Sequence, residues 1–219
     1  MNHLQIPVKA GIFAVTWNSR GLLSRIDWFD TGASMGFDAP TPSNSAASWN
    51  LISKVSLAPP LLDLFSRFQA YFEHGEPLGA IPWDYIDTTG WTDFQHGVYR
   101  ASSLIPHGET RPYAWVARRS GQGLATRAVG QALRKNPLPI LIPCHRVVSS
   151  GNSIGGFMGI NDPNQPEMKF KRFLIDLENR YLNPVFPFLE GGFGLSTAST
   201  PSSPLGSLAA GEIQSSLFA

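Results

Sequence analysis

The pattern of apolar and polar positions predicts a β-hairpin near the start of the chain. Residues 11–17 and 21–29 are rich in Ile, Val, Phe, Trp and Leu, and the polar residues 18–20 separate them. Apolar runs of this length around a polar turn are typical of paired strands. Residues 31–50 carry Gly, Ser, Pro, Ala and Asn with little periodicity, so we expect a long loop there.

Helical spacing of apolar residues follows this loop and dominates the rest of the chain. The apolar positions within 61–72 recur every three to four residues and Gly75 follows them, which predicts a helix that begins at Pro59. Four more helices are predicted, at residues 93–104, 113–119, 126–134 and 169–178. A glycine-bearing turn of about four residues separates the third and fourth of the five helices, which is a helix-turn-helix pattern.

Two further segments complete the predicted organisation. Residues 138–148 are apolar but include Pro139 and Pro143, so they are expected to form a buried extended segment rather than a helix. A stretch of residues interrupted by Gly and Pro, 76–90, marks the expected domain boundary. Residues 184–219 are rich in Ser, Gly, Ala and Pro, and we expect a tail without fixed structure.

Composition narrows the class of protein. The 219 residues include 17 basic and 16 acidic side chains and are 42% hydrophobic, which excludes a wholly disordered chain. The single cysteine, Cys144, excludes an intramolecular disulfide and a zinc site built on several thiolates, and fits a reducing compartment. No signal peptide or membrane-spanning run is found, so an intracellular protein without membrane association is expected.

Basic residues are concentrated in one part of the chain. Between residues 107 and 148 the single acid is Glu109, and the bases are Arg111, Arg118, Arg119, Arg127, Arg134, Lys135 and Arg146. A local charge of +6 on a helix-turn-helix predicts a face that binds nucleic-acid phosphates. A solvated helical surface is the alternative interpretation.

Cys144 has the neighbours of a reactive thiol. His145 and Arg146 follow it directly, and basic or cationic neighbours favour the nucleophilic thiolate. Pro143 removes a backbone donor and restricts the chain just before the sulfur. The alternative is an inert, buried cysteine, which is the more common state of a lone cysteine in an apolar segment.

The residues around Cys144 resemble a known family. Residues 143–147, Pro-Cys-His-Arg-Val, resemble the active-site motif of the O6-alkylguanine-DNA alkyltransferases. Residues 127–142 resemble the family's approach to that motif, 108–113 its entry into the helix-turn-helix, and 155–159 its pocket loop. The resemblance covers residues 92–178 in the right order and is highly specific.

The resemblance implies an α+β fold with two domains and a tail. Residues 1–88 would form a small N-terminal, β-rich, RNase H-like domain. Residues 89–183 would form a helical catalytic domain of the winged-helix, helix-turn-helix kind, and 184–219 the tail. The implied partner is double-stranded DNA containing alkylated guanine, bound by a monomer that is cytoplasmic in a prokaryote or nuclear in a eukaryote.

The implied reaction is direct repair in a single turnover. The alkyl group of O6-alkylguanine moves irreversibly to Cys144 after base flipping, without a metal or organic cofactor, and O4-alkylthymine is a second candidate substrate. The roles assigned by resemblance are Cys144 as acceptor, His145 as general base through a water, Glu178 as its orienting group, Tyr113 as proton donor to guanine, and Asn136 as the tie between recognition helix and active-site segment.

The same resemblance assigns the DNA face and the pocket. Arg127 would fill the gap left by the flipped base, and an arginine can stack there and donate hydrogen bonds. The other DNA-binding residues would be Thr126, Ala128, Gly130, Arg134 and Lys135. The pocket residues would be Leu133, Pro139, Val147, Phe157, Met158 and Gly159.

Some features depart from the family and leave rival functions to compare. Phe157 and Met158 supply no hydroxyl where many relatives have Tyr or Ser, and residues 160–168 form a longer segment that suggests a turn beside the pocket. One rival is a non-catalytic sensor of alkyl damage, which would lack the cysteine. Others are a regulator with a cysteine-rich metal region and a cysteine hydrolase. Cys144 disfavours the first, the single cysteine excludes the second, and nothing supplies the turnover chemistry of the third.

Overall fold

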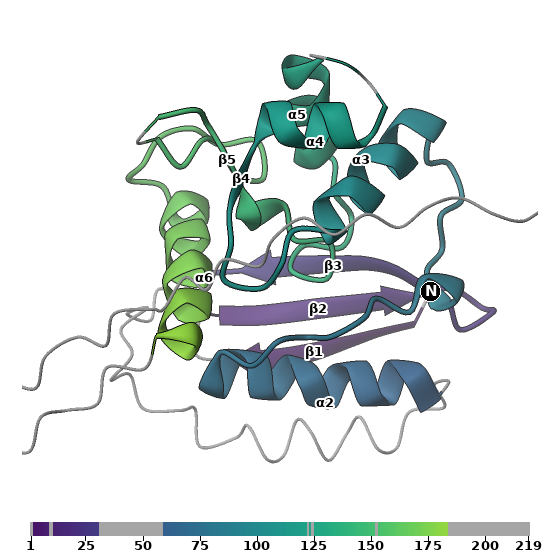
Figure 1. The fold of residues 1–219 in the computed structure, drawn as a ribbon. Helices are drawn as coiled ribbons and strands as arrows, with labels where there is room; N and C mark the ends of the chain where they lie inside the picture. Colours follow the sequence, from purple (N-terminus) through teal and green to yellow (C-terminus); the bar gives the residue numbers. More distant parts are fainter. Residues whose placement is uncertain are drawn as a thin grey trace, which may run out of the picture. The chain divides into compact units, whose positions relative to one another are not determined.

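Three antiparallel strands form the sheet of the N-terminal half. The computed structural model describes residues 2–8, 11–30, 59–121, 123, 125–151 and 153–183. The sheet has the order β1-β2-β3, from β1 (Asn2–Val8), β2 (Gly11–Trp17) and β3 (Leu23–Phe29) (Figure 1). The predicted hairpin is confirmed as β2 and β3, whereas no strand was predicted before Gly11. The region predicted to form a loop, 31–50, lies outside the described residues.

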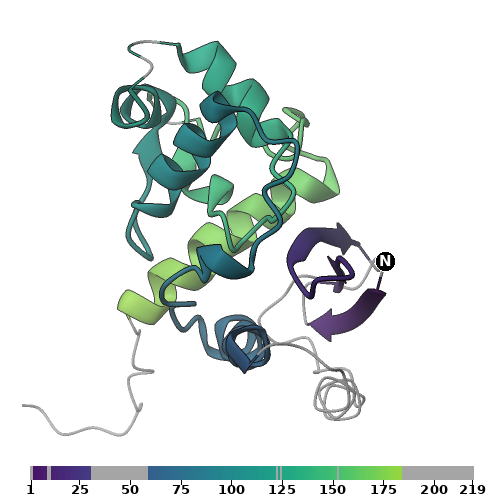
Figure 2. The same cartoon turned by 90° about the vertical axis from the view of Figure 1, so that its right-hand side faces the viewer.

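Helix α2 (Pro59–His74) packs along this sheet (Figures 1 and 2). Alternate residues of β2 are buried, as expected for a strand with one covered face. Phe13 on β2 lies with its ring centroid 5.1 Å from that of Phe72 on α2 and 5.9 Å from that of Phe170. The helix predicted from Pro59 is therefore confirmed, and its apolar face forms part of the core.

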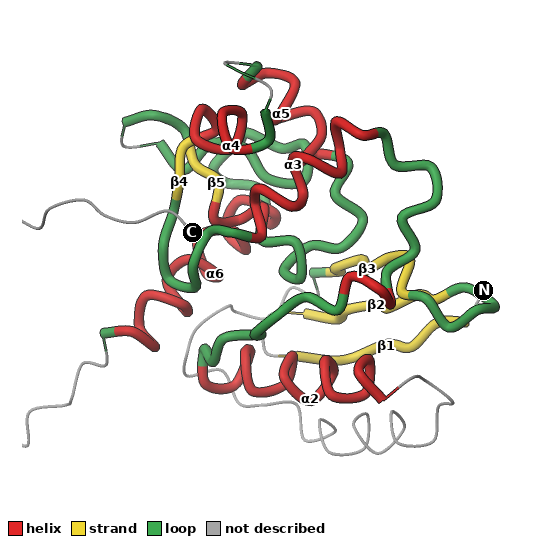
Figure 3. The backbone as a smooth tube through the Cα atoms, turned by 45° about the vertical axis from the view of Figure 1, so that its right-hand side comes forward, coloured by secondary structure: helices red, strands yellow, loops and turns green. Residues whose placement is uncertain are grey.

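The helices of the C-terminal half begin and end close to their predicted bounds. They are α3 (Asp93–Ser103), α4 (Tyr113–Arg119) and α5 (Thr126–Arg134). Thr92 and Gln95 form a capping box at the start of α3, which satisfies backbone donors that have no partner inside the helix. Val98, Val116 and Val129, one on each helix, are fully buried. Figure 3 shows these helices gathered apart from the sheet.

The segment 138–148 is buried as predicted, but it is not extended throughout. A 3₁₀ turn, η2 (Cys144–Arg146), interrupts it, and β5 (Val147–Val148) then pairs in parallel with β4 (Arg111–Pro112). The turn closes through the backbone, where Arg146 N donates to Pro143 O at 3.0 Å. Apolar composition predicted burial correctly, but this local hydrogen bonding was not visible in the pattern.

The last helix, α6 (Pro166–Leu182), is longer than the predicted 169–178 at both ends. Pro166 occupies the first turn, where its missing N–H costs no hydrogen bond. The indole of Trp28 on β3 stacks on the ring of Phe170, with centroids 4.3 Å apart. Helix α6 therefore packs against the sheet.

Hydrogen bonds tie strand β3 to the segments that follow α2 and α5. Ile26 N donates to Pro137 O at 2.8 Å, and Asp87 N donates to Leu23 O at 2.8 Å, just after the 3₁₀ helix η1 (Trp83–Tyr85). The edge of the sheet thus lies directly beside the chain that leads to Cys144. Among the described helices, none is long and apolar enough to cross a membrane. The predicted tail, 184–219, lies outside the described residues.

Candidate active site

Cys144 opens the turn η2 and is held by the end of α5. Its side chain is 7% exposed, and Asn136 Nδ2 donates to its Sγ at 3.2 Å. Asn136 Nδ2 also donates to Ile142 O at 2.9 Å, and its Oδ1 accepts from Leu138 N at 3.0 Å. One amide side chain therefore fixes the backbone before the cysteine and also contacts the thiol.

The surroundings of the thiol have opposing effects on its pKa. Burial raises the pKa of Cys144, because a thiolate loses solvation there, while the hydrogen bond from Asn136 and the charge of Lys171 lower it. The balance leaves the pKa above its ordinary value. At neutral pH the resting group is consequently the thiol, and a nearby base is needed to produce the nucleophilic thiolate.

Lys171 is a buried cation beside Cys144 that the sequence analysis did not single out. Its Nζ donates to Val147 O at 2.6 Å and to Gly156 O at 3.0 Å, and its side chain is fully buried. Burial lowers its pKa to about 8, although the charge of Cys144 acts in the opposite direction. A sequence signal did exist, since Lys171 and Glu178 lie two helical turns apart on the apolar face of α6.

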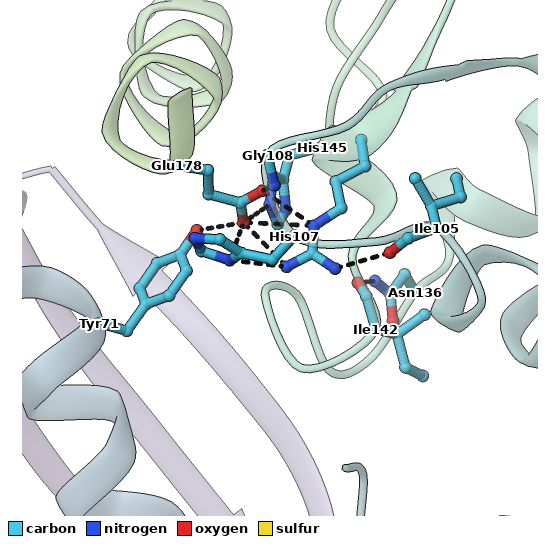
Figure 4. Close-up of polar contacts among 9 residues, drawn as sticks. Tyr71, Ile105, His107, Gly108, Asn136, Ile142, His145 and Glu178 are labelled. Atoms are coloured by element: carbon cyan, nitrogen blue, oxygen red, sulfur yellow. Dashed lines mark hydrogen bonds and ion pairs between the residues drawn. The ribbon is translucent and has the colours of Figure 1, made fainter. Parts of the chain in front are cut away.

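Glu178 is the centre of a buried polar network (Figure 4). Its Oε1 lies 2.8 Å from His145 Nε2 and accepts from Tyr71 OH at 2.9 Å, and its Oε2 accepts from Gly108 N at 2.9 Å. Arg146 donates to both oxygens, at 2.9 to 3.2 Å. Burial by itself would raise the pKa of Glu178, but His145 and Arg146 hold it well below its usual range.

The geometry defines the protonation of His145. An ionised carboxylate only accepts hydrogen bonds, so Nε2 of His145 carries the proton that points to Glu178. Its Nδ1 is buried and has no hydrogen-bond partner among the described residues. Burial lowers the pKa of His145 although Glu178 opposes this, so the neutral imidazole with a free Nδ1 lone pair is the resting form.

The position of Arg146 corrects one part of the prediction that the bases of residues 107–148 form a phosphate-binding face. Arg146 was counted among the bases of the phosphate-binding face, but it is 9% exposed and engages Glu178 and Ile105 O. Arg111 is likewise paired, with Glu109. The exposed charge of this region therefore comes from the remaining arginines and Lys135.

A cavity of about 280 Å³ opens beside Cys144. Its wall is formed by Tyr113, Arg127, Gly130, Gln131, Leu133, Arg134, Cys144, Gly156, Phe157, Met158, Gly159 and Asn161. Tyr113 OH donates to Gly156 O at 3.3 Å, and burial together with the charge of Cys144 raises the pKa of this tyrosine. Phenol, thiol, amide and guanidinium groups therefore surround one space large enough for a flat heterocycle.

Two of the predicted pocket residues lie elsewhere. Pro139 borders a second cavity of about 420 Å³, which lies between β3 and the end of α5 and also reaches Cys144 and Met158. Lys135, predicted to bind DNA, lines that second cavity as well. Val147 is fully buried and lines neither cavity, and its carbonyl binds Lys171 instead.

The segment after the pocket loop 155–159 supplies an amide to the cavity wall, whereas the loop itself supplies no hydroxyl. Phe157 and Met158 line the cavity without polar groups, but Asn161, from the longer segment after Gly159, lines it too. A side chain at position 156 would collide with Asn161 Oδ1, so Gly156 allows this close approach. The turn predicted beside the pocket thus contributes a polar group of its own.

Helix α5 presents a basic, solvent-exposed face at the rim of the cavity. Arg127, Ala128, Arg134 and Lys135 are exposed, and Thr126 and Gly130 are half-buried. Arg127 and Arg134 also line the cavity. Ala128 and Gly130 have little or no side chain, so nothing protrudes from α5 between these cations. A nucleic-acid backbone can therefore approach the helix closely there.

Known proteins are similar in sequence to different parts of this chain. A family model described as 6-O-methylguanine DNA methyltransferase, DNA binding domain, matches residues 93–180. The constitutive methylated-DNA–protein-cysteine methyltransferase of Bacillus subtilis is 36% identical over 120 residues, which are 55% of this chain and 67% of the relative. The Methanosarcina barkeri enzyme of that name is 43% identical over 91 residues, and the match spans 42% of this chain and about half (53%) of the relative.

Solved structures extend the similarity into the N-terminal half. The crystal structure of Mycobacterium tuberculosis OGT in complex with DNA superposes with a TM-score of 0.58 at 26% identity and covers 83% of this chain and 94% of that one. The small antiparallel sheet and the helices are thus arranged as in that protein. Sequence and structure together show that this chain belongs to the methylated-DNA–protein-cysteine methyltransferase family.

Proposed function

We propose that this protein repairs O6-alkylguanine in double-stranded DNA by transferring the alkyl group irreversibly to Cys144. The observation that carries the proposal is the position of Cys144 on the wall of a cavity whose rim is the exposed basic face of α5. Asn136 and the His145–Glu178 pair lie beside the same residue. A nucleophile, a base and an orienting carboxylate are the components of an activated thiol.

The chemical step follows from this geometry. Nδ1 of His145 removes the proton of the Cys144 thiol through a water, and Glu178 stabilises the imidazolium that forms. The thiolate attacks the alkyl carbon, so one S–C bond forms while the C–O6 bond of the guanine breaks. Tyr113 donates a proton to the departing guanine, so the proton lost by the thiol balances the proton gained by the base. The S–C bond of the thioether formed at Cys144 is not broken again, so each molecule reacts once.

The DNA contact is assigned to α5 and its flanks. Arg127 fills the space of the flipped base, and Arg134 and Lys135 neutralise phosphates. Thr126, Ala128 and Gly130 bring the helix close to the groove. The related OGT structure in complex with DNA supports a role of this kind. Flipping costs a few kcal/mol, which these contacts offset in part.

The proposal includes the finer organisation of the chain. Residues 1–88 form an RNase H-like domain, 89–183 a winged-helix catalytic domain, and 184–219 a tail without fixed structure. The protein acts as a monomer inside the cell and uses O4-alkylthymine as a second substrate. The rival function, a non-catalytic damage sensor, is disfavoured because the nucleophile is present together with its base.

Intact-protein mass measurement tests the proposed transfer. Incubation with a duplex containing one O6-methylguanine should add the mass of one methylene group, since a methyl replaces the thiol proton. Peptide mapping should locate it at Cys144. The Cys144→Ala variant should bind the duplex and gain no mass. Repeated turnover by one molecule, or modification at another residue, would show that the proposal is wrong.

A further inference from the structure

A tyrosine from the N-terminal half reaches the carboxylate of the active-site network. Tyr71 lies on α2, is fully buried, and donates through its hydroxyl to Glu178 Oε1 at 2.9 Å. The two residues are 107 positions apart. Figure 4 shows Tyr71 and Glu178 meeting from two different helices. Among the described residues, Tyr71 is the hydrogen-bond donor that α2 supplies to this carboxylate.

The hydroxyl contacts the same oxygen that supports His145. Oε1 of Glu178 lies between Tyr71 OH and His145 Nε2, whereas Oε2 is bound by Gly108 N and Arg146. Arg146 Nη2 also approaches Oε1, at 2.9 Å. Without Tyr71, the carboxylate can turn toward the guanidinium of Arg146 and away from His145. The phenol therefore fixes the oxygen that stabilises the imidazolium.

The backbone at the end of α2 allows the hydroxyl of Tyr71 to contact Glu178. Gly75, with a φ of +76°, ends the helix, and a Cβ at this position would lie 2.9 Å from Leu177 O and 3.1 Å from the Cβ of Tyr181. Such distances are too short for ordinary contact, so glycine permits α2 to approach α6 this closely. Tyr71, one helical turn earlier, is thereby held within hydrogen-bond distance of α6.

We propose that Tyr71 is a positioning residue for Cys144, acting through Glu178 and His145, so that the N-terminal half takes part in activating the thiol. The inference deepens the proposed function and rests on it only in assigning His145 as the base for Cys144.

The charged or titratable groups that face Glu178 are Tyr71 from α2, His107 from the loop before Gly108, and His145 and Arg146 from η2. Burial raises the pKa of Tyr71 well above its ordinary value, so its hydroxyl remains a donor at neutral and moderately alkaline pH.

The lone cysteine allows a test that needs no DNA. Iodoacetamide alkylates only thiolates efficiently, and Cys144 is the single cysteine of the chain. Its alkylation rate, followed by intact mass from about pH 6 to about pH 10, reports the thiol directly. Tyr71→Phe should react about three- to tenfold more slowly near neutral pH, as expected for loss of one buried hydrogen bond. Its pH profile should also shift toward higher pH.

Phe65→Leu is the control for general destabilisation. Phe65 is buried on the same helix as Tyr71, α2, and its apolar side chain cannot donate a hydrogen bond to Glu178. This variant should lose similar thermal stability and keep the wild-type pH profile of alkylation. In a Glu178→Gln background, Tyr71→Phe should change the alkylation rate by less than about twofold, because the acceptor through which it acts has changed.

The outcomes separate this inference from the proposed repair function. A Tyr71→Phe profile that matches wild type, or that shifts toward lower pH, overturns the positioning role. An equal shift in Phe65→Leu overturns it as well, because the effect would then be general destabilisation. Methyl transfer from DNA is measured separately. If wild type fails to accept methyl groups but the Tyr71→Phe profile still shifts, the proposed function fails and the positioning role stands.

Discussion

The Nδ2 atom of Asn136 lies 3.2 Å from the Sγ of Cys144 and donates a hydrogen bond to it. The same amide holds the backbone on both sides of the intervening segment, through Ile142 O and Leu138 N. One side chain therefore contributes both to the position of the thiol and to its electrostatic surroundings. A hydrogen bond to the charged form of a group lowers its pKa, so this contact favours the thiolate.

Replacing Asn136 should raise the pKa of Cys144 and slow methyl transfer. Asn136→Asp keeps the shape but substitutes acceptors for the amide donor, so the thiolate loses a hydrogen bond and gains a repulsive charge. A lost hydrogen bond to a charged group costs about 1.5–3 kcal/mol, which predicts a rate at least about tenfold lower. The second-order transfer rate on O6-methylguanine duplex measures this. A rate within twofold of wild type would contradict the assigned role.

Lys171 should support both the fold and the thiolate. Lys171→Met keeps most of the volume but leaves the carbonyls of Val147 and Gly156 without their donor and removes the cation near Cys144. We expect a free energy of unfolding lower by about 1–3 kcal/mol and slower alkylation of Cys144 by iodoacetamide. Lys169→Met is the control, because Lys169 is exposed on the same helix. Similar behaviour of the two variants would refute the prediction.

Stability should fall as the pH is lowered from 7 to 5. Burial lowers the pKa of both His107 and His145, against the opposing charge of Glu178. Below about pH 6.5 the unfolded chain therefore binds protons that the folded chain excludes, which favours unfolding. Glu178 remains ionised in the folded protein throughout this window, and its own contribution is lost only at more acidic pH.

Urea denaturation at several pH values measures this dependence. The free energy of unfolding should be lower at about pH 5 than at about pH 7, by roughly 1–2 kcal/mol if both histidines contribute. His107→Gln, which removes one of the two groups, should show a shallower dependence. A wild-type curve that is flat across this range would be inconsistent with buried, neutral histidines.

Asn161 should influence which alkylated bases are accepted. Its amide lines the cavity where Phe157 and Met158 supply no hydrogen-bonding side chain. Asn161→Ala should slow transfer from O6-methylguanine by about three- to tenfold, the effect of one lost hydrogen bond to the base. Asn164→Ala is the matched control, since Asn164 lies in the same segment but does not line the cavity. Equal transfer rates for the two variants would show that Asn161 does not contact the alkylated base.

Arg127 should matter for duplex DNA more than for the chemistry. Free O6-benzylguanine needs no base flipping, so Arg127→Ala should slow repair of a duplex much more than reaction with the free base. Arg172→Ala, an exposed arginine on α6, should affect neither reaction. Equal losses on both substrates would count against the flipping role of Arg127.

Binding of the wild-type protein to duplex DNA should weaken as the salt concentration rises. The logarithm of the binding constant should fall against the logarithm of the salt concentration with a slope on the order of −3 if about three phosphates are neutralised.

Local patterns in the sequence determined the bounds of most helices, the hairpin and the candidate nucleophile. Apolar spacing defined α2 and α3 to within a residue, because each buries one face that must repeat every three to four residues. The turn residues that follow α4 and α5 defined those two helices equally well. The run around Cys144 was recognisable for a related reason. Its chemistry depends on neighbours in the chain, namely Pro143, His145 and Arg146.

Only the tertiary structure decided which further groups lie around the segment of Cys144 and His145. Glu178 was expected beside His145 from the family resemblance, but Tyr71 and Lys171 were not. No local periodicity specifies that Tyr71 binds Glu178 or that Lys171 binds Val147 O. Tertiary contacts also assigned Arg146 to Glu178 rather than to the exposed basic face. The reason is energetic, because a buried charge must find a partner wherever the fold provides one, and that partner can lie at any distance along the sequence.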